Sequence, residues 1–102
     1  MRTIYKYGPL RPTVLTTLKI HDRAMIRHVG VQRLPGAEDG IFLWAEVEDT
    51  NPMVEVSYVV VGTGFDLDKW AHARAHLGTV ITPFVWHVYS VQPSAPGTPS
   101  SP

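Results

Sequence analysis

Turn-forming residues divide this chain of 102 residues into short runs that are rich in β-branched and aromatic side chains. Runs of this kind, bounded by Gly, Pro, Asn and Asp, are typical of strands. The regular alternation of strands and helices that a Rossmann-like fold requires is missing. The pattern instead favours a mainly β fold, a small antiparallel barrel or sandwich of about six strands. The predicted strands cover residues 3–7, 14–20, 24–33, 41–48, 53–61 and 84–91.

Alternation within two of these runs predicts which side chains share a face. One face of the second run carries Val14, Thr16, Leu18 and Ile20, and one face of the fifth carries Val54, Val56, Tyr58 and Val60. Gly8-Pro9 is expected to end the first strand. Gly30 indicates a bulge or the close approach of another strand within the third.

One short helix is predicted over residues 65–78. Asp66 or Asp68 is suited to cap its N-terminus, and Gly78 is suited to end it. Lys69, His72 and His76 would then lie away from the apolar stripe. That stripe would consist of Leu67, Trp70, Ala71 and Leu77.

The chain is expected to form a single β-rich domain over residues 1–92. Residues 93–102 contain only Pro, Ser, Gly, Thr and Ala, and a segment without large apolar side chains cannot form a core. We therefore predict a disordered Pro/Ser tail over residues 93–102.

Composition restricts the classes of function. The absence of cysteine excludes disulfides, thiolate metal sites and cysteine nucleophiles. Nine basic and nine acidic residues give zero net charge, so the chain as a whole is not drawn to nucleic acid or to an anionic membrane. No apolar run approaches the roughly 20 residues that span a bilayer. We expect a cytoplasmic protein without a membrane partner.

Two motifs near the predicted helix raise the question of a ligand. His72 and His76 would share a helix face, but two histidines without a third ligand do not make a metal site. Gly62-Thr63-Gly64 follows an apolar strand, where phosphate loops also lie, yet it lacks the remaining residues of a dinucleotide loop or a P-loop. We interpret these glycines in the first place as a tight turn at the end of the strand.

The last predicted strand is the other candidate for a binding surface, because it combines Trp86, His87 and Tyr89. We interpret Trp86 as a core residue, whereas the exposure of His87 and Tyr89 is open. The ligand-binding residues predicted from the sequence are therefore Gly62, Thr63, Gly64, His87 and Tyr89. Their ligand would be held by glycine backbone, a hydroxyl and an aromatic wall.

The sequence contains no recognisable catalytic constellation. A nucleophilic serine, a histidine and an aspartate can be assembled from most chains, and no nucleophile elbow is present here. We expect a protein that is not an enzyme, with no catalytic residue, no metal site and no cofactor.

Five short motifs in a fixed order carry a family resemblance that covers most of residues 3–90. They are Ile4-Tyr5-Lys6-Tyr7, Leu43-Trp44-Ala45, Val61-Gly62-Thr63-Gly64, Leu77-Gly78-Thr79-Val80 and Phe84-Val85-Trp86-His87-Val88-Tyr89. In these motifs the chain resembles small bacteriophage and prophage proteins with a domain of unknown function. The longer 66–76 segment and the Pro/Ser tail depart from the family pattern. The resemblance implies a phage or mobile-element origin and supplies no reaction.

Three functions follow in order of preference. The first is a phage-encoded accessory protein that binds a host or phage protein, or a second copy of itself, through exposed strand edges. The second is a module that binds or sequesters a small nucleotide-like ligand. The third is a single-stranded nucleic-acid binder, with aromatics stacking bases on a strand face. Burial of Trp44, Trp86 and Tyr89 would weaken the second and third.

Overall fold

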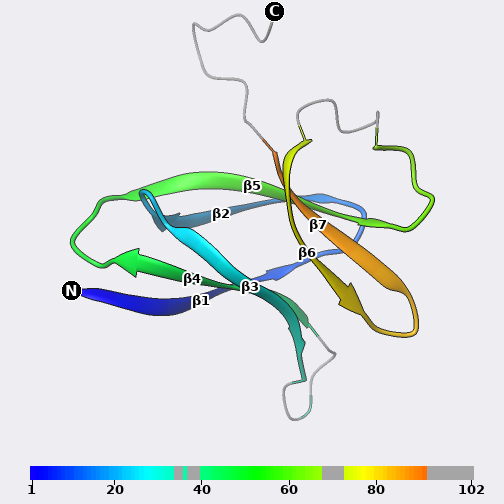
Figure 1. Cartoon of the computed structure of the whole chain (residues 1–102), viewed down its shortest axis with the longest axis horizontal. Coiled ribbons are helices and arrows are strands. Elements are labelled where there is room, and N and C mark those ends of the chain that lie inside the picture. Colours follow the sequence, from blue (N-terminus) through cyan, green and yellow to red (C-terminus); the bar gives the residue numbers. More distant parts are fainter. Residues whose placement is uncertain (34–35, 37–39, 68–72, 92–102) are drawn as a thin grey trace, which may run out of the picture.

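The computed structural model describes residues 1–33, 36, 40–67 and 73–91 of the protein, with seven strands in two antiparallel sheets (Figure 1). Sheet A has the order β1-β4-β3 and sheet B the order β2-β5-β7-β6. The predicted mainly β fold is confirmed, as an open sandwich rather than a closed barrel. The strands are β1 (Arg2–Leu10), β2 (Leu15–His21), β3 (Met25–Gln32), β4 (Gly40–Glu48), β5 (Met53–Gly62), β6 (Ala73–Ile81) and β7 (Val85–Val91).

The six predicted strands correspond to β1 to β5 and β7. The prediction that Gly8-Pro9 ends the first strand is wrong, since β1 continues to Leu10. Its pairing with β4 shifts register between Tyr7 and Leu10, and the peptide bond between Gly8 and Pro9 is cis. The glycine and proline therefore interrupt the ladder with an irregularity, beyond which the strand resumes and buries Leu10.

The predicted helix over residues 65–78 is also wrong, because residues 73–81 form β6 and pair with β7. Residues 68–72, which include the proposed cap Asp68, lie outside the described residues. No α-helix occurs in the part of the chain that the structure describes. Gly78 lies inside β6, where an added Cβ would be 3.1 Å from the side chain of Val29. The glycine thus lets β3 approach β6, and tertiary pairing outweighs local helix propensity.

The hydrophobic core lies between the two sheets and receives side chains from both. Of the side chains that the alternation groups on one face, Ile20, Tyr58 and Val60 are buried. Burial raises the pKa of Tyr58 to about 12, since the ionised phenolate loses its hydration. The central cluster consists of Leu10, Val29, Ile41, Leu43, Tyr58, Val60, Val80 and Val88.

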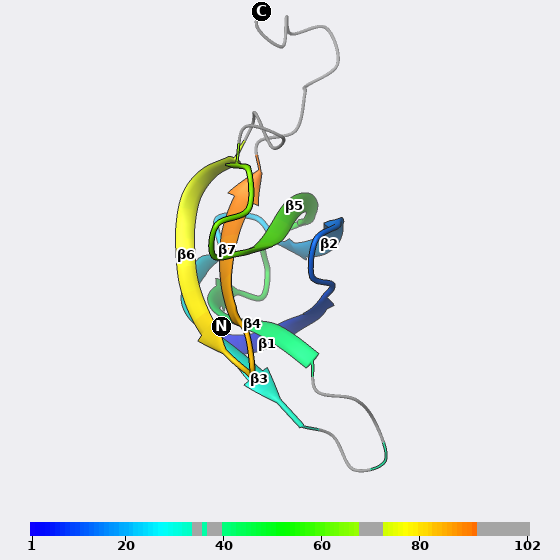
Figure 2. The ribbon, with the colours of Figure 1, turned by 90° about the vertical axis from the view of Figure 1, so that its right-hand side faces the viewer.

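The edges of the sandwich differ from each other. On one side β3 packs beside β6 without joining its sheet (Figures 1 and 2). On the other side the Tyr7 hydroxyl lies 3.0 Å from His21 Nδ1, and the Tyr5 ring lies 5.5 Å from the His21 ring. Partial burial raises the pKa of Tyr7. Side-chain contacts thus connect the sheets where no ladder does.

The predicted Pro/Ser tail over residues 93–102 lies outside the described residues. The domain boundary at residue 92 stays a prediction for the same reason. The last described residue, Val91, ends β7 in the middle of sheet B, between β5 and β6.

Candidate binding site

The glycine motif that follows β5 forms a hydrogen-bonded turn. The Phe65 amide donates to the Gly62 carbonyl at 3.1 Å, and Gly64 has a φ of 86°. A positive φ at the third position of such a turn favours glycine strongly. The Thr63 amide also donates to the Val85 carbonyl at 3.3 Å, which ties the turn to the start of β7. The interpretation of these glycines as a turn at a strand end is therefore confirmed.

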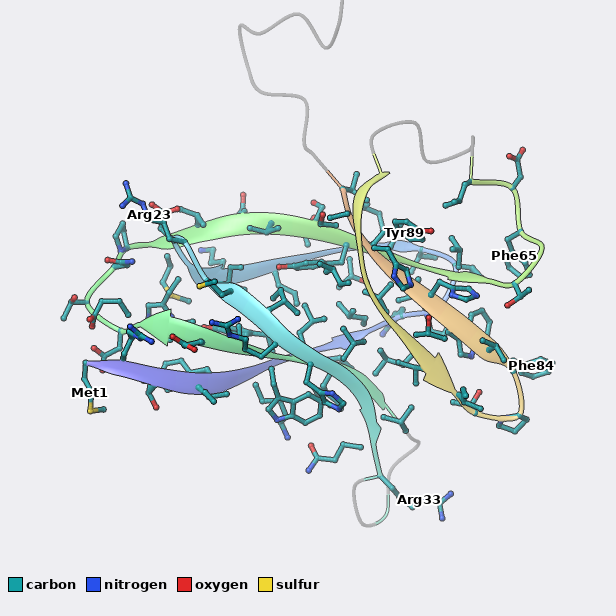
Figure 3. All side chains as sticks on the ribbon, viewed as in Figure 1. Met1, Arg23, Arg33, Phe65, Phe84 and Tyr89 are labelled. Atoms are coloured by element: carbon teal, nitrogen blue, oxygen red, sulfur yellow. The ribbon has the colours of Figure 1, made fainter. Side chains whose placement is uncertain are left out.

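A second turn, between β6 and β7, presents Phe84. The Thr82 amide and the Thr82 hydroxyl both donate to the Phe84 carbonyl, at 2.8 and 3.0 Å. The Phe84 amide donates back to Thr82 Oγ1 at 3.1 Å. These three hydrogen bonds fix the backbone around Pro83, so that the Phe84 side chain projects from the end of sheet B (Figure 3).

The two turns flank an aromatic cleft at this end of the molecule. Trp86 lies between two phenylalanines in edge-to-face contact, with ring centroids 6.2 Å from Phe65 and 6.1 Å from Phe84. Phe65 is 52% exposed and Phe84 is 68% exposed, whereas Trp86 packs partly against the core. The cleft has a volume of about 520 Å³ and is lined by Gly62, Thr63, Phe65, Pro83, Phe84, Val85 and Trp86.

Gly62 shapes this cleft as well as the turn. A Cβ added at Gly62 would lie 2.9 Å from the Phe65 ring, so the ring rests against glycine backbone. Gly62 also pairs with Trp86 across the β5–β7 ladder. The ladder therefore brings the end of the glycine motif and the tryptophan together, and the turn folds Phe65 over both.

A polar group lies on the opposite face of β7, because successive side chains of a strand alternate. Thr63 Oγ1 lies 2.8 Å from His87 Nε2, and Thr79 Oγ1 lies 3.1 Å from His87 Nδ1. Thr79 Oγ1 is also 3.2 Å from His76 Nε2. The His76 ring contacts both the His87 ring and the Tyr89 ring, with centroids 5.9 and 5.3 Å away.

The chemistry of this polar group is that of hydroxyls and imidazoles. Both ring nitrogens of His87 face threonine hydroxyls, Thr63 on Nε2 and Thr79 on Nδ1. The described residues include no group of three or more His, Cys, Asp or Glu that could hold a metal ion. The arrangement is suited to hydrogen bonding.

The structure brings together some of the five residues predicted from the sequence. Gly62 and Thr63 line the aromatic cleft, and Thr63 connects the cleft to His87. Tyr89 reaches the same polar group through His76. Gly64 serves the turn and is not among the residues that line the cleft, and a Cβ placed there would meet open space.

Sequence reasoning missed two residues of the site, Phe65 and Phe84. The sequence places Phe65 at the start of the predicted helix and Phe84 at the start of the last predicted strand. Their place in the sequence could have indicated the site, because each phenylalanine directly follows a turn motif, Gly62-Thr63-Gly64 or Thr82-Pro83. Large aromatics at the ends of turns are exposed unless another element covers them.

The histidine pair considered for a metal does not form the predicted helix face. His76 lies on β6, while His72 lies outside the described residues. The spacing of four residues that would align two side chains on a helix therefore has no such meaning at His76.

The outer face of sheet A carries a second set of aromatic residues, which we call the sheet A patch. The Phe42 and Trp44 rings are 6.3 Å apart, and His28 lies 5.3 Å from Trp44. Lys6 Nζ stands 4.8 Å above the Phe42 ring and donates to Gln32 Oε1 at 2.5 Å. Trp44, Trp86 and Tyr89 are all partly buried, so their exposure does not separate core from binding surface.

Two basic side chains of sheet A share one carboxylate. Arg2 and Arg27 both pair with Glu46, at 2.6 and 3.2 Å. Arg27 donates to the same carboxylate through Nε at 3.3 Å. These ion pairs reduce the positive charge that a nucleic-acid backbone would need on this face.

Among the described residues, no helix is long and apolar enough to cross a membrane.

Comparison with known proteins identifies a family but no activity. A search of curated proteins and a search of solved structures each gave no match. A family model with the description "Domain of unknown function (DUF7352)" matches residues 1–98, nearly the whole chain. The chain therefore belongs to the DUF7352 family.

Proposed function

We propose that this protein is a non-enzymatic binding module that recognises a partner protein through the aromatic cleft. The observation that carries the proposal is the exposure of Phe65 and Phe84 on either side of Trp86. Aromatic side chains supply much of the energy of protein interfaces, and clustered exposed apolar groups mark such sites. Covering these rings with a partner would remove apolar surface from water.

The cleft is organised before a partner arrives. Hydrogen bonds at Gly62–Phe65 and Thr82–Phe84 hold the turns that carry the two phenylalanines. A surface that is already ordered loses less conformational entropy on binding than a mobile loop. This supports the cleft as a recognition surface in preference to the strand edges that the sequence suggested.

The kind of partner follows from the family resemblance rather than from the cleft. The resemblance to small bacteriophage and prophage proteins supports an accessory role in which the partner is a host or phage protein. Such a protein would act in the cytoplasm of the host cell. Zero net charge suits an interface that depends on apolar contact rather than on electrostatic steering.

A small-ligand module is the second candidate, favoured by the size of the cleft. A volume of about 520 Å³ falls within the range of roughly 300–1,000 Å³ that is typical of ligand pockets. A planar ring could stack on Trp86 while the Thr63 hydroxyl binds its polar edge. However, none of the described lining residues is Arg or Lys, the side chains that most often pair with a nucleotide phosphate.

Single-stranded nucleic acid ranks third. The sheet A patch offers aromatic rings on a strand face, but Phe42 is only 6% exposed and lies beneath Lys6. A base could stack there only after Lys6 leaves its place. The pairing of Arg2 and Arg27 with Glu46 further weakens the basic groove that this function requires.

A capture experiment with matched variants tests the proposal. The protein and a Phe65→Ser/Phe84→Ser variant are immobilised and exposed to host lysate, with and without phage infection. An Ile4→Ser/Met53→Ser variant is the control, since it removes two exposed apolar side chains of 59% and 50% exposure from other strands. We expect a protein retained by the original chain and the control to be lost by the cleft variant.

Two outcomes would contradict the proposal. Equal retention by all three chains would show that the partner binds elsewhere. A nucleotide-like compound released from the original chain and absent from the cleft variant, detected by mass spectrometry, would favour the small-ligand candidate. Each bound species is then confirmed by titration with the purified component.

A further inference from the structure

The prolines that follow β7 recur at every third position. Pro93, Pro96, Pro99 and Pro102 are each separated by two small residues. A polyproline II helix has three residues per turn, so prolines at this spacing share one edge of the helix. The repeated PxxP pattern is the kind of ligand that aromatic-lined grooves bind, because its extended backbone is already ordered.

The aromatic cleft has the properties of such a groove. Phe65, Trp86 and Phe84 offer three ring surfaces in a row, two of them exposed. None of the described residues that line the cleft is charged, and residues 93–102 contain no charged side chain. The match is therefore apolar on both sides and leaves no ion without a partner.

The length of the chain permits this contact within one molecule. Trp86 lies five residues before Val91 on β7, a distance of roughly 17 Å at the usual rise of a strand. Seven residues, 92–98, span up to about 22 Å in a polyproline II conformation. The segment that follows Val91 is therefore long enough for Pro99 and Pro102 to reach the cleft, whereas Pro93 and Pro96 are too close to Val91 in the sequence to reach it.

We propose that Pro99-Ser100-Ser101-Pro102 docks into the aromatic cleft of its own chain. Tethering gives a short segment an effective concentration in the millimolar range, so even a weak PxxP contact is occupied for much of the time. The inference rests on the proposed function in taking the cleft as the binding surface. It also identifies the partner as a protein with a proline-rich segment, which must displace residues 99–102.

Paramagnetic labelling tests the contact directly in the full chain. Because the protein has no cysteine, Ser101→Cys accepts a single nitroxide label, and Ser94→Cys is a matched control in the same segment. We expect the label at position 101 to broaden the NMR signals of the Trp86 indole and the Phe65 and Phe84 amides. The label at position 94 should broaden signals near Val91 instead.

Two further variants establish that the prolines are responsible. Pro99→Ala/Pro102→Ala in the labelled Ser101→Cys chain should restore at least half of the lost Trp86 signal. Pro93→Ala/Pro96→Ala, which changes the same number of prolines outside the contact, should leave the broadening unchanged. Equal effects of the two double variants would overturn the role of Pro99 and Pro102.

The remaining outcomes are equally decisive. Broadening confined to the Val91 end with both labels would overturn the docking. Broadening of an isotope-labelled chain by a separate nitroxide-labelled chain would assign the contact to a second copy and overturn the intramolecular proposal. Loss of the partner by the Phe65→Ser/Phe84→Ser variant would still support the proposed function in either case, so the two proposals fail separately.

Discussion

The molecule contains two clusters in which phenylalanine contacts tryptophan, and the clusters differ in how far their phenylalanine rings are exposed. In the sheet A patch, the Phe42 ring is tilted against Trp44, lies beneath Lys6 and is 6% exposed. In the aromatic cleft, Trp86 contacts Phe65 and Phe84 edge to face, and these two are 52% and 68% exposed. Lys6, from a neighbouring strand, covers Phe42, whereas the two phenylalanines of the cleft stay exposed.

The difference in exposure indicates where apolar surface of the protein remains in contact with water. A ring that is already buried contributes to folding, whereas an exposed ring gains its hydrophobic contribution only when something covers it. Substitutions in the sheet A patch should therefore act on stability. Substitutions in the cleft should act on binding and leave stability nearly unchanged.

The largest effect is expected for Phe42→Ala. Removing a buried phenylalanine costs about 3–5 kcal/mol of unfolding free energy, from lost transfer energy and from the cavity left behind. Urea denaturation followed by circular dichroism measures this value. A loss below about 1 kcal/mol would show that the patch is not a closed, packed group and would remove the contrast with the cleft.

The buried Tyr58 should make the stability of the core depend on pH in the alkaline range. Its pKa is raised to about 12 in the folded protein from 10.0 in the unfolded chain. Between these values the unfolded chain loses the proton while the folded protein keeps it, so stability falls as pH rises from 10 to 12. We expect a loss of roughly 2–3 kcal/mol, measured by denaturation at each pH.

Tyr58→Phe is the control for this alkaline loss. The variant removes the ionisable hydroxyl and should show a flatter profile over the same pH range. An identical fall in both proteins would assign the alkaline instability to other groups and would contradict the ionisation of Tyr58 as its cause.

Two glycines, Gly40 beside the sheet A patch and Gly62 beside the aromatic cleft, allow a matched comparison of the two clusters. The expected losses of stability are smaller than that of Phe42→Ala. A Cβ at Gly40 would lie 2.7 Å from the Phe42 ring, and one at Gly62 would lie 2.9 Å from the Phe65 ring. Phe42 is buried and cannot move away, so Gly40→Ala should cost about 1–3 kcal/mol. Phe65 can turn into solvent, so Gly62→Ala should cost less than about 0.5 kcal/mol and weaken partner binding instead. Thermal denaturation and binding assays on both variants reverse or confirm this order.

The smallest effect on stability is expected for Phe84→Ala. The ring is 68% exposed, and surface substitutions usually change the free energy of unfolding by less than about 0.5 kcal/mol. Partner capture, however, should fall sharply in the same variant. A destabilisation as large as that of Phe42→Ala would mean that the cleft is part of the folded core rather than a surface kept open for binding.

Much of the fold could be predicted from local patterns, because most strands here are apolar runs closed by turns. Six of the seven strands lie where such runs predict them. The stretch before Gly78 misled because alanine favours helices, while Ala71, Ala73, Ala75 and Leu77 also alternate with polar residues at the period of a strand. Pairing with β7 decides between the two, and pairing is not a local property.

The site was predictable in part for the same reason. The turn at Gly62–Gly64 follows from glycine conformations, which are local. The aromatic cleft depends on the β5–β7 register, which places Gly62 opposite Trp86 and sets Phe65 beside a residue far along the chain. Without that register, Phe65 and Phe84 are only two aromatics near turns, and Trp86 is a core residue. The structure shows that Trp86 packs against the core and also lines the cleft.

The order of strands in the sheets has a consequence for synthesis of the chain. Within the described residues, β1, β2 and β3 share no ladder with one another; β1 and β3 pair with β4, and β2 pairs with β5. A ribosome adding roughly 5–20 residues per second therefore releases three strands before the first partner strand exists. The nascent N-terminal region must wait for residues beyond 40 before any sheet can nucleate. Until then the unpaired strand edges expose backbone N–H and C=O groups, through which nascent chains can aggregate. A chaperone that binds at that stage would cover backbone groups that later pair in the two sheets.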